Sequence, residues 1–220
     1  FVSVIPCIYM DLGIKSRLDR TGSNGRFVIV PMDQGITLGP IDGLRDIEST
    51  IDTVTSHGAD SVLTKKGLAP RVHPNKNGRG YFVHLNAATA IGPDANDKRV
   101  TGTVKEAVRL GADGVSFHIN VGSRYEPDQI EALSRVTRTA SEYGLPTLAM
   151  TYARGPDIDE HDSESLAHAV RLGEELGADI IKTAYSGDPE SFAEVTAATS
   201  RPVGNAGGSP RSHKATLEIV

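Results

Sequence analysis

A short phrase that recurs three times constrains the fold of this chain more than any other feature. It reads Gly-Ala-Asp and stands at Gly58-Ala59-Asp60, Gly111-Ala112-Asp113 and Gly177-Ala178-Asp179. Each copy follows an amphipathic stretch and precedes a run rich in apolar residues. Glycine commonly ends a helix, and short apolar runs of this kind are typical of buried strands. The phrase therefore predicts three junctions at which a helix passes into a strand.

Two further junctions use proline, at Leu145-Pro146 and at Arg201-Pro202, where a helical stretch again stops before an apolar run. The apolar runs at 27–32 and 81–85 bring the number of strand signals to seven. Helical stretches separate most of them. Alternating strands and helices predict parallel strands that are joined by helical crossovers.

Helix starts are also visible in the sequence. Thr103 with Glu106 has the spacing of a capping box, and Asp188 before Pro189 has the pattern of an N-cap followed by proline at the first helical position.

Two folds have this alternation, a closed (β/α)8 barrel and an open doubly wound sheet. The open sheet usually carries a glycine-rich nucleotide loop after its first strand, and the stretch 31–36 does not read G-x-G-x-x-G. We therefore predict the α/β class and a (β/α)8 TIM barrel. Polar residues follow the expected strand ends, which meet at one face of a barrel. They are Asp33, Lys65, His84, Asn86, His118, Asn120, Tyr152, Arg154 and Lys182.

Length and composition fit one ordinary domain. The chain has 220 residues, of which 38% are hydrophobic, and a net charge of -5, which argues against a nucleic-acid binder. The single cysteine, Cys7, excludes an internal disulfide, and no apolar run approaches the roughly 20 residues of a membrane span. We expect a cytoplasmic protein. Residues 1–10 make a poor secretion signal and are interpreted as an extraneous or disordered leader, and residues 11–220 as one barrel domain.

Lys182 is the first candidate catalytic residue, because it interrupts an apolar strand just before a loop. Burying an ammonium group is costly, and an amine in a dry pocket can attack a ketone to form a Schiff base. Tyr152 and Asp33, after two other strands, add a phenol and a carboxylate. Schiff-base aldol chemistry needs these three functions. The glycine pair Gly207-Gly208 could present backbone N–H groups to a phosphate.

Each of these residues also has a purely structural interpretation. Lys182 could extend between barrel and helices, Tyr152 could be an ordinary strand-end aromatic, and Asp33 could start a turn. Arg154 could pair with a surface carboxylate or grip a substrate carboxylate or phosphate. The glycine pair could serve only a tight turn.

Six short motifs, taken in order, resemble the archaeal class I aldolases of the fructose-bisphosphate aldolase type over about residues 12–209. The motifs are Pro31–Thr37, Lys66-Gly67, His84–Asn86, Thr151–Gly155, Lys182–Asp188 and Ala206–Gly208.

This resemblance implies roles for individual residues. It makes Lys182 the Schiff-base lysine, Tyr152 the proton donor and Asp33 the proton acceptor. The substrate contacts that it implies are Asp33, Gln34, Gly35, Ile36, Thr37, Tyr152, Ala153, Arg154, Gly207 and Gly208.

Within this family, the resemblance implies a transaldol transfer as the reaction. A phosphorylated ketose is cleaved through an enamine on Lys182, and the enamine is added to L-aspartate semialdehyde, in the biosynthesis of aromatic amino acids. Cleavage of fructose 1,6-bisphosphate is the alternative within the family. The resemblance implies no metal and no cofactor, and it implies a homo-oligomer, since relatives form large rings.

The chain departs from the family pattern at two places. Gln34 stands where the family usually has histidine, and an amide cannot carry a proton at neutral pH. The sequence also ends at Val220, after what is expected to be the seventh helix. We therefore expect a barrel that lacks its eighth strand and helix in this chain.

Two other functions remain open from the residues alone. Asp33, His84 and His118 could bind a metal in a lyase or hydrolase, although neither a His-x-His pair after the first strand nor an H-E-x-x-H motif is present. An inert or phosphosugar-binding barrel is the other alternative. Borohydride trapping and chelators would distinguish these functions.

Overall fold

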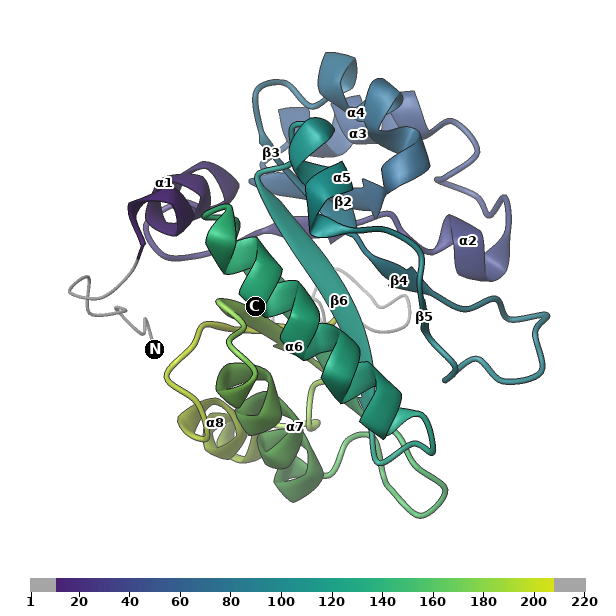
Figure 1. Ribbon diagram of the computed structural model, residues 1–220, viewed down its shortest axis with the longest axis vertical. Helices are drawn as coiled ribbons and strands as arrows, with labels where there is room; N and C mark the ends of the chain where they lie inside the picture. The colour runs from purple at the N-terminus through teal and green to yellow at the C-terminus, as the bar shows by residue number, and fades with distance from the viewer. Residues whose placement is uncertain (1–10, 208–220) are drawn as a thin grey trace.

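The computed structural model describes residues 11–207, which form a curved parallel sheet with helices packed against it (Figure 1). The sheet has seven strands in the order β1-β2-β3-β6-β7-β8-β9, and every neighbouring pair is parallel. The strands are β1 (Ile29–Pro31), β2 (Ser61–Lys65), β3 (Gly80–His84), β6 (Gly114–Val121), β7 (Thr147–Ala153), β8 (Ile180–Thr183) and β9 (Val203–Asn205). All seven strand signals are confirmed, and so is the predicted barrel class.

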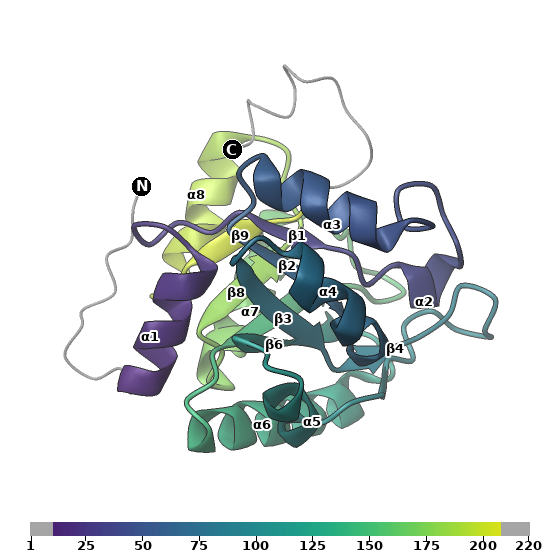
Figure 2. The ribbon, with the colours of Figure 1, turned by 90° about the horizontal axis from the view of Figure 1, so that it is seen from above.

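Most of the helices lie around the outside of the curved sheet, as Figure 2 shows. The helices are α1 (Leu12–Thr21), α2 (Gly35–Leu38), α3 (Ile47–Ser56), α4 (Ala69–Asn75), α5 (Val104–Arg109), α6 (Glu126–Glu142), α7 (Ser163–Glu175) and α8 (Pro189–Ala197), with a 3-10 turn at Lys66–Leu68. Both predicted helix starts are confirmed. Thr103 and Glu106 form a reciprocal capping box at α5, and Asp188 accepts two backbone N–H bonds at the start of α8.

The three Gly-Ala-Asp junctions share one hydrogen-bonding pattern. Each aspartate carboxylate accepts a bond from the backbone N–H of a residue 32 positions upstream, and its own N–H donates to the carbonyl of that same residue. The pairs are Val28 with Asp60, Tyr81 with Asp113, and Thr147 with Asp179. The glycines have φ between +69° and +110°, where a side chain would be strained. The phrase thus ends a helix and fixes the next strand against its neighbour.

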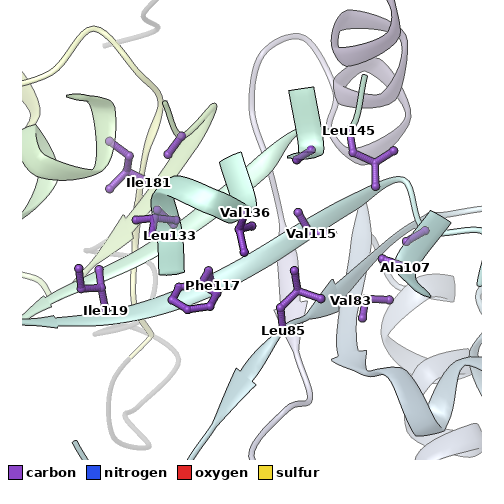
Figure 3. Packing of buried hydrophobic residues seen from close by; sticks show 14 of the residues in the cluster. Val83, Leu85, Ala107, Val115, Phe117, Ile119, Leu133, Val136, Leu145 and Ile181 are labelled. Atoms are coloured by element: carbon purple, nitrogen blue, oxygen red, sulfur yellow. The ribbon is translucent and has the colours of Figure 1, made fainter. Parts of the chain in front are cut away.

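Side chains of alternate strand residues form two apolar cores. The outer core lies between sheet and helices, where Leu133 and Val136 of α6 pack with Phe117 of β6 (Figure 3). The inner core lies inside the curved sheet and contains Leu63, Phe82, Leu148, Met150 and Ile180. Because strand residues alternate between faces, this second set identifies the residues that face inward.

Helix α1 covers the amino-terminal end of the strands. Ile14 and Leu18 pack into the inner core, and Arg20 Nε lies 2.8 Å from Asp113 Oδ1, just before β6. This role was not predicted.

A second unpredicted feature is a two-stranded antiparallel ribbon, β4 (Asn86–Ala87) with β5 (Arg99–Val100), which follows β3. The expected leader at 1–10 and Gly208 lie outside the described residues. Within residues 11–207, no helix has the length and apolar content needed to cross a membrane.

Candidate active site

The alternation of side chains carries a set of polar residues to the carboxyl-terminal mouth of the barrel. On β7 the inward residues Leu148 and Met150 are followed on the same face by Tyr152, and on β8 Ile180 is followed by Lys182. The apolar inner core therefore gives way to chemistry-bearing side chains as the strands end. Active sites of TIM barrels lie at this end.

Lys182 lies on the inner face of β8 and is half-buried. It pairs in register with Met150 of β7, which belongs to the inner core. Its charge acts on both His84 and His118 and contributes to lowering the pKa of each. The lysine therefore shares the mouth with the side chains of β3 and β6, as the Schiff-base hypothesis requires.

Tyr152 is held by contacts on its aromatic ring. The ring of His118 lies 5.0 Å from it, and the guanidinium carbon of Arg154 lies 4.6 Å from the ring centroid. Arg154 also forms an ion pair with Glu160, at 3.1 Å between Nε and Oε2. The carboxylate partner that the sequence left open for Arg154 is thus present, and the same guanidinium lies over the tyrosine.

Asp33 follows β1 and faces His84 at the end of β3, with 3.7 Å between Asp33 Oδ2 and His84 Nε2. The other ring nitrogen, Nδ1, lies 2.7 Å from Ser116 Oγ of β6. His84 and Ser116 are both buried and are partners in the register of β3 and β6. Burial is the main cause that holds the pKa of His84 well below its usual value, so its imidazole is neutral at neutral pH.

Two more lysines reach this mouth. Burial lowers the pKa of Lys65, at the end of β2, to about 8, and Asp33 opposes this shift. Lys65 Nζ donates to the backbone oxygen of Asn86. Burial also lowers the pKa of Lys98. The charge of Arg154 lowers this pKa further, and the Asp33 carboxylate opposes the shift. The mouth therefore carries several cationic groups near the Asp33 carboxylate, an arrangement that suits anionic substrates.

Lys98 is the residue that sequence reasoning missed. It lies between β4 and β5, in a loop whose Asn96 carbonyl accepts bonds from Asn120 (3.2 Å) and Gln129 (2.7 Å). Asn86 at the base of the ribbon exchanges two hydrogen bonds with the backbone of His118. These bonds fix the loop against β6 and α6 and bring Lys98 toward the site. No motif or periodicity in the sequence indicates this.

The alternative metal site is not formed by its three proposed ligands. Asp33 and His84 are neighbours, but His118 Nε2 lies 2.7 Å from Asn120 Oδ1. Burial lowers the pKa of His118 to about 3. Within the described part of the chain, no group of three or more His, Cys, Asp or Glu side chains could hold a metal ion.

The other residues that the family resemblance implies as substrate contacts lie in different parts of the structure. Gln34 to Thr37 form and precede the short helix α2, and Thr37 Oγ1 donates to the carbonyl of Ala88 in the ribbon loop, at 3.0 Å. The Ala153 side chain belongs to the outer core, so it points away from the mouth. Gly207 is exposed just after β9. Gly208 is outside the described residues.

Comparison with known proteins places the chain in a family. Residues 27–220 match the family described as DeoC/LacD family aldolase. The chain belongs to the DeoC/LacD family of aldolases. The predicted aldolase class is therefore confirmed.

Two relatives are named as 2-amino-3,7-dideoxy-D-threo-hept-6-ulosonate synthases, the second of them as synthase 1. That of Halobacterium salinarum is 62% identical over 96% of this chain and 79% of its own length. A second, from Archaeoglobus fulgidus, is 42% identical over 95% of this chain and 78% of its length.

A solved structure of an archaeal fructose-1,6-bisphosphate aldolase has the same fold, with a TM-score of 0.84 and 28% identity. The match covers 94% of this chain and 85% of the other. In that protein the catalytic lysine is covalently bound to the carbinolamine intermediate of the substrate.

Proposed function

We propose that this aldolase is a Schiff-base transaldolase with 2-amino-3,7-dideoxy-D-threo-hept-6-ulosonate synthase activity. It takes an enamine from a phosphorylated ketose and adds it to L-aspartate semialdehyde. The observation that carries the proposal is the position of Lys182, on the inner face at the carboxyl end of β8, in one mouth with Tyr152 and Asp33. The 62% identity to the halobacterial synthase favours this reaction over others in the family.

The proposed chemistry assigns one task to each of the three residues. Lys182 Nζ attacks the ketone carbon, and Tyr152 protonates the carbinolamine hydroxyl, which leaves as water and yields an iminium. The iminium accepts the electron pair of the adjacent carbon–carbon bond, while Asp33 takes the proton of the departing carbon's hydroxyl. An aldehyde is released and an enamine stays on Lys182.

The second half of the reaction runs in the opposite direction. The enamine carbon attacks the aldehyde carbon of the acceptor, and the new alkoxide takes a proton. Water then adds to the iminium and releases the ketone product with the free amine of Lys182. The donor carries a phosphate and the acceptor a carboxylate, so the cationic groups Lys65, Lys98 and Arg154 support the binding of these anionic groups in the mouth. A homo-oligomer and a cytoplasmic location stay predictions.

Cleavage of fructose 1,6-bisphosphate is the second candidate, favoured by the fold shared with the archaeal fructose-1,6-bisphosphate aldolase. The two activities separate in one assay, in which the chain is given a phosphorylated deoxyketohexose or fructose 1,6-bisphosphate, each with and without L-aspartate semialdehyde. We expect a seven-carbon amino acid product that requires both the deoxy sugar and the semialdehyde. Equal or faster cleavage of fructose 1,6-bisphosphate would contradict the proposal.

A further inference from the structure

Three neighbouring side chains, of which the first two are hydrogen-bonded, lead to the proposed proton acceptor from inside the barrel. The contacts run from Ser116 Oγ to His84 Nδ1, at 2.7 Å, and from His84 Nε2 to Asp33 Oδ2, at 3.7 Å. Ser116 is 0% exposed, so no substrate can reach its hydroxyl and it is not a nucleophile. The order of groups resembles a catalytic triad, but the end that faces the mouth is the carboxylate.

The surroundings of His84 keep its imidazole uncharged. It is 4% exposed, and the cationic groups Lys65, Lys98 and Lys182 face it from β2, the ribbon loop and β8, together with His118 from β6. Asp33 is the one carboxylate within ion-pair distance of it in the described residues. A neutral imidazole has a single N–H, so the two ring nitrogens must take different roles.

The two neighbours of His84 together favour one tautomer. The Asp33 carboxylate can only accept, so it favours an N–H on Nε2, and the Ser116 hydroxyl, which can donate or accept, then donates to Nδ1. The distance of 3.7 Å exceeds a hydrogen bond, and such contacts commonly tighten, or are bridged by water, when substrate binds.

We propose that His84, in the Nε2–H tautomer that Asp33 and Ser116 favour together, is a positioning residue that orients the Asp33 carboxylate as proton acceptor. An imidazolium would form a full ion pair with Asp33 and weaken it as a base, whereas a neutral N–H donor directs one oxygen and leaves the other free for the substrate hydroxyl. The inference rests on the proposed function, since it gives Asp33 its task in carbon–carbon cleavage.

A matched pair of substitutions tests this role. In His84→Gln the amide nitrogen occupies about the place of Nε2 and keeps a donor toward Asp33, while in His84→Asn it occupies the place of Nδ1 and removes that donor. We expect His84→Asn to lower kcat about 30-fold with KM changed less than threefold, since a well-placed base contributes on the order of 10²–10⁴-fold. His84→Gln should stay within about fivefold of the wild type. His57→Asn, on an exposed histidine at the end of α3, is the control.

Ser116→Ala provides a second, smaller change. If Ser116 acts only through His84, this variant should lose about fivefold in kcat in the wild-type background and nothing further in the His84→Asn background. Equal kcat for His84→Asn, His84→Gln and wild type would overturn the proposal, and so would additive effects of Ser116→Ala and His84→Asn. Should His84→Asn fail to fold, Ser116→Ala decides alone, and an unchanged kcat then overturns the proposal.

Borohydride trapping distinguishes failure of the positioning role of His84 from failure of the proposed function. All variants should trap the ketose on Lys182 as well as the wild type does, because imine formation does not use Asp33. A wild type that neither traps the ketose nor transfers it refutes the function itself. A wild type that does both, with indifferent His84 variants, refutes only the positioning role.

Discussion

Among single residues, Lys65 gives the clearest expectation for how the free energy of unfolding depends on pH. Burial lowers its pKa from 10.5 to about 8 in the folded chain, so between these values the unfolded state binds more protons than the native state. Stability should therefore rise with pH across this window, and the cost of the buried charge should be fully present below pH 8.

The measurement compares the wild type with Lys65→Met, because groups remote from position 65 titrate equally in both. The difference in their free energies of unfolding should change by about 3 kcal/mol between pH 7 and pH 10.5, in favour of the wild type at high pH. A constant difference across that range would show that Lys65 is not buried as described.

How far single residues could be predicted depends on whether the strand pattern places them. Lys182 and Tyr152 lie near the ends of strands that are easily recognised, and Asp33 follows another; the alternation of a parallel sheet then directs them inward. Lys98 lies in a loop between two strands of two residues each, which have no detectable periodicity. The Ser116 to His84 contact depends on the register of β3 against β6, which only the folded structure determines.

At the scale of elements, the Gly-Ala-Asp junctions do more than end helices. Asp179 is buried, and burial raises the pKa of its carboxyl, yet it accepts the N–H of Thr147 at 2.9 Å. We expect Asp179→Ala to lower the free energy of unfolding by about 1–3 kcal/mol, because a buried N–H at the start of β7 then has no partner.

Urea denaturation measures this change, with Asp157→Ala in an exposed loop as the control. Each variant removes one aspartate carboxylate. An equal and small loss of unfolding free energy in both would therefore mean that the junction aspartates do not hold the strands in register. The sequence indicated the junctions because glycine and the following apolar run are local signals. It did not indicate the bond across 32 residues, which is a tertiary contact.

At the scale of the whole molecule, stability and the proposed chemistry lie at opposite ends of the barrel. Leu18 of α1 packs into the inner core at the amino-terminal end, while Lys182 and its neighbours lie at the carboxyl-terminal mouth. We expect Leu18→Ala to cost about 2–4 kcal/mol of unfolding free energy, as core truncations do, with kcat/KM unchanged well below the melting temperature. Thermal melts and initial rates on the same sample test this, and a loss of activity that matches the loss of stability at low temperature would contradict it.

The claim on which the whole account depends is that the Lys182 amine forms a covalent imine with the ketose donor. The direct measurement is reduction with borohydride in the presence of the donor sugar, followed by mass spectrometry of the peptides, with Lys182→Met as the matched control. The account predicts one reduced adduct, on Lys182, that is absent without sugar and absent in the variant. An adduct on Lys65 or Lys98 in place of Lys182, or turnover by Lys182→Met, would contradict it.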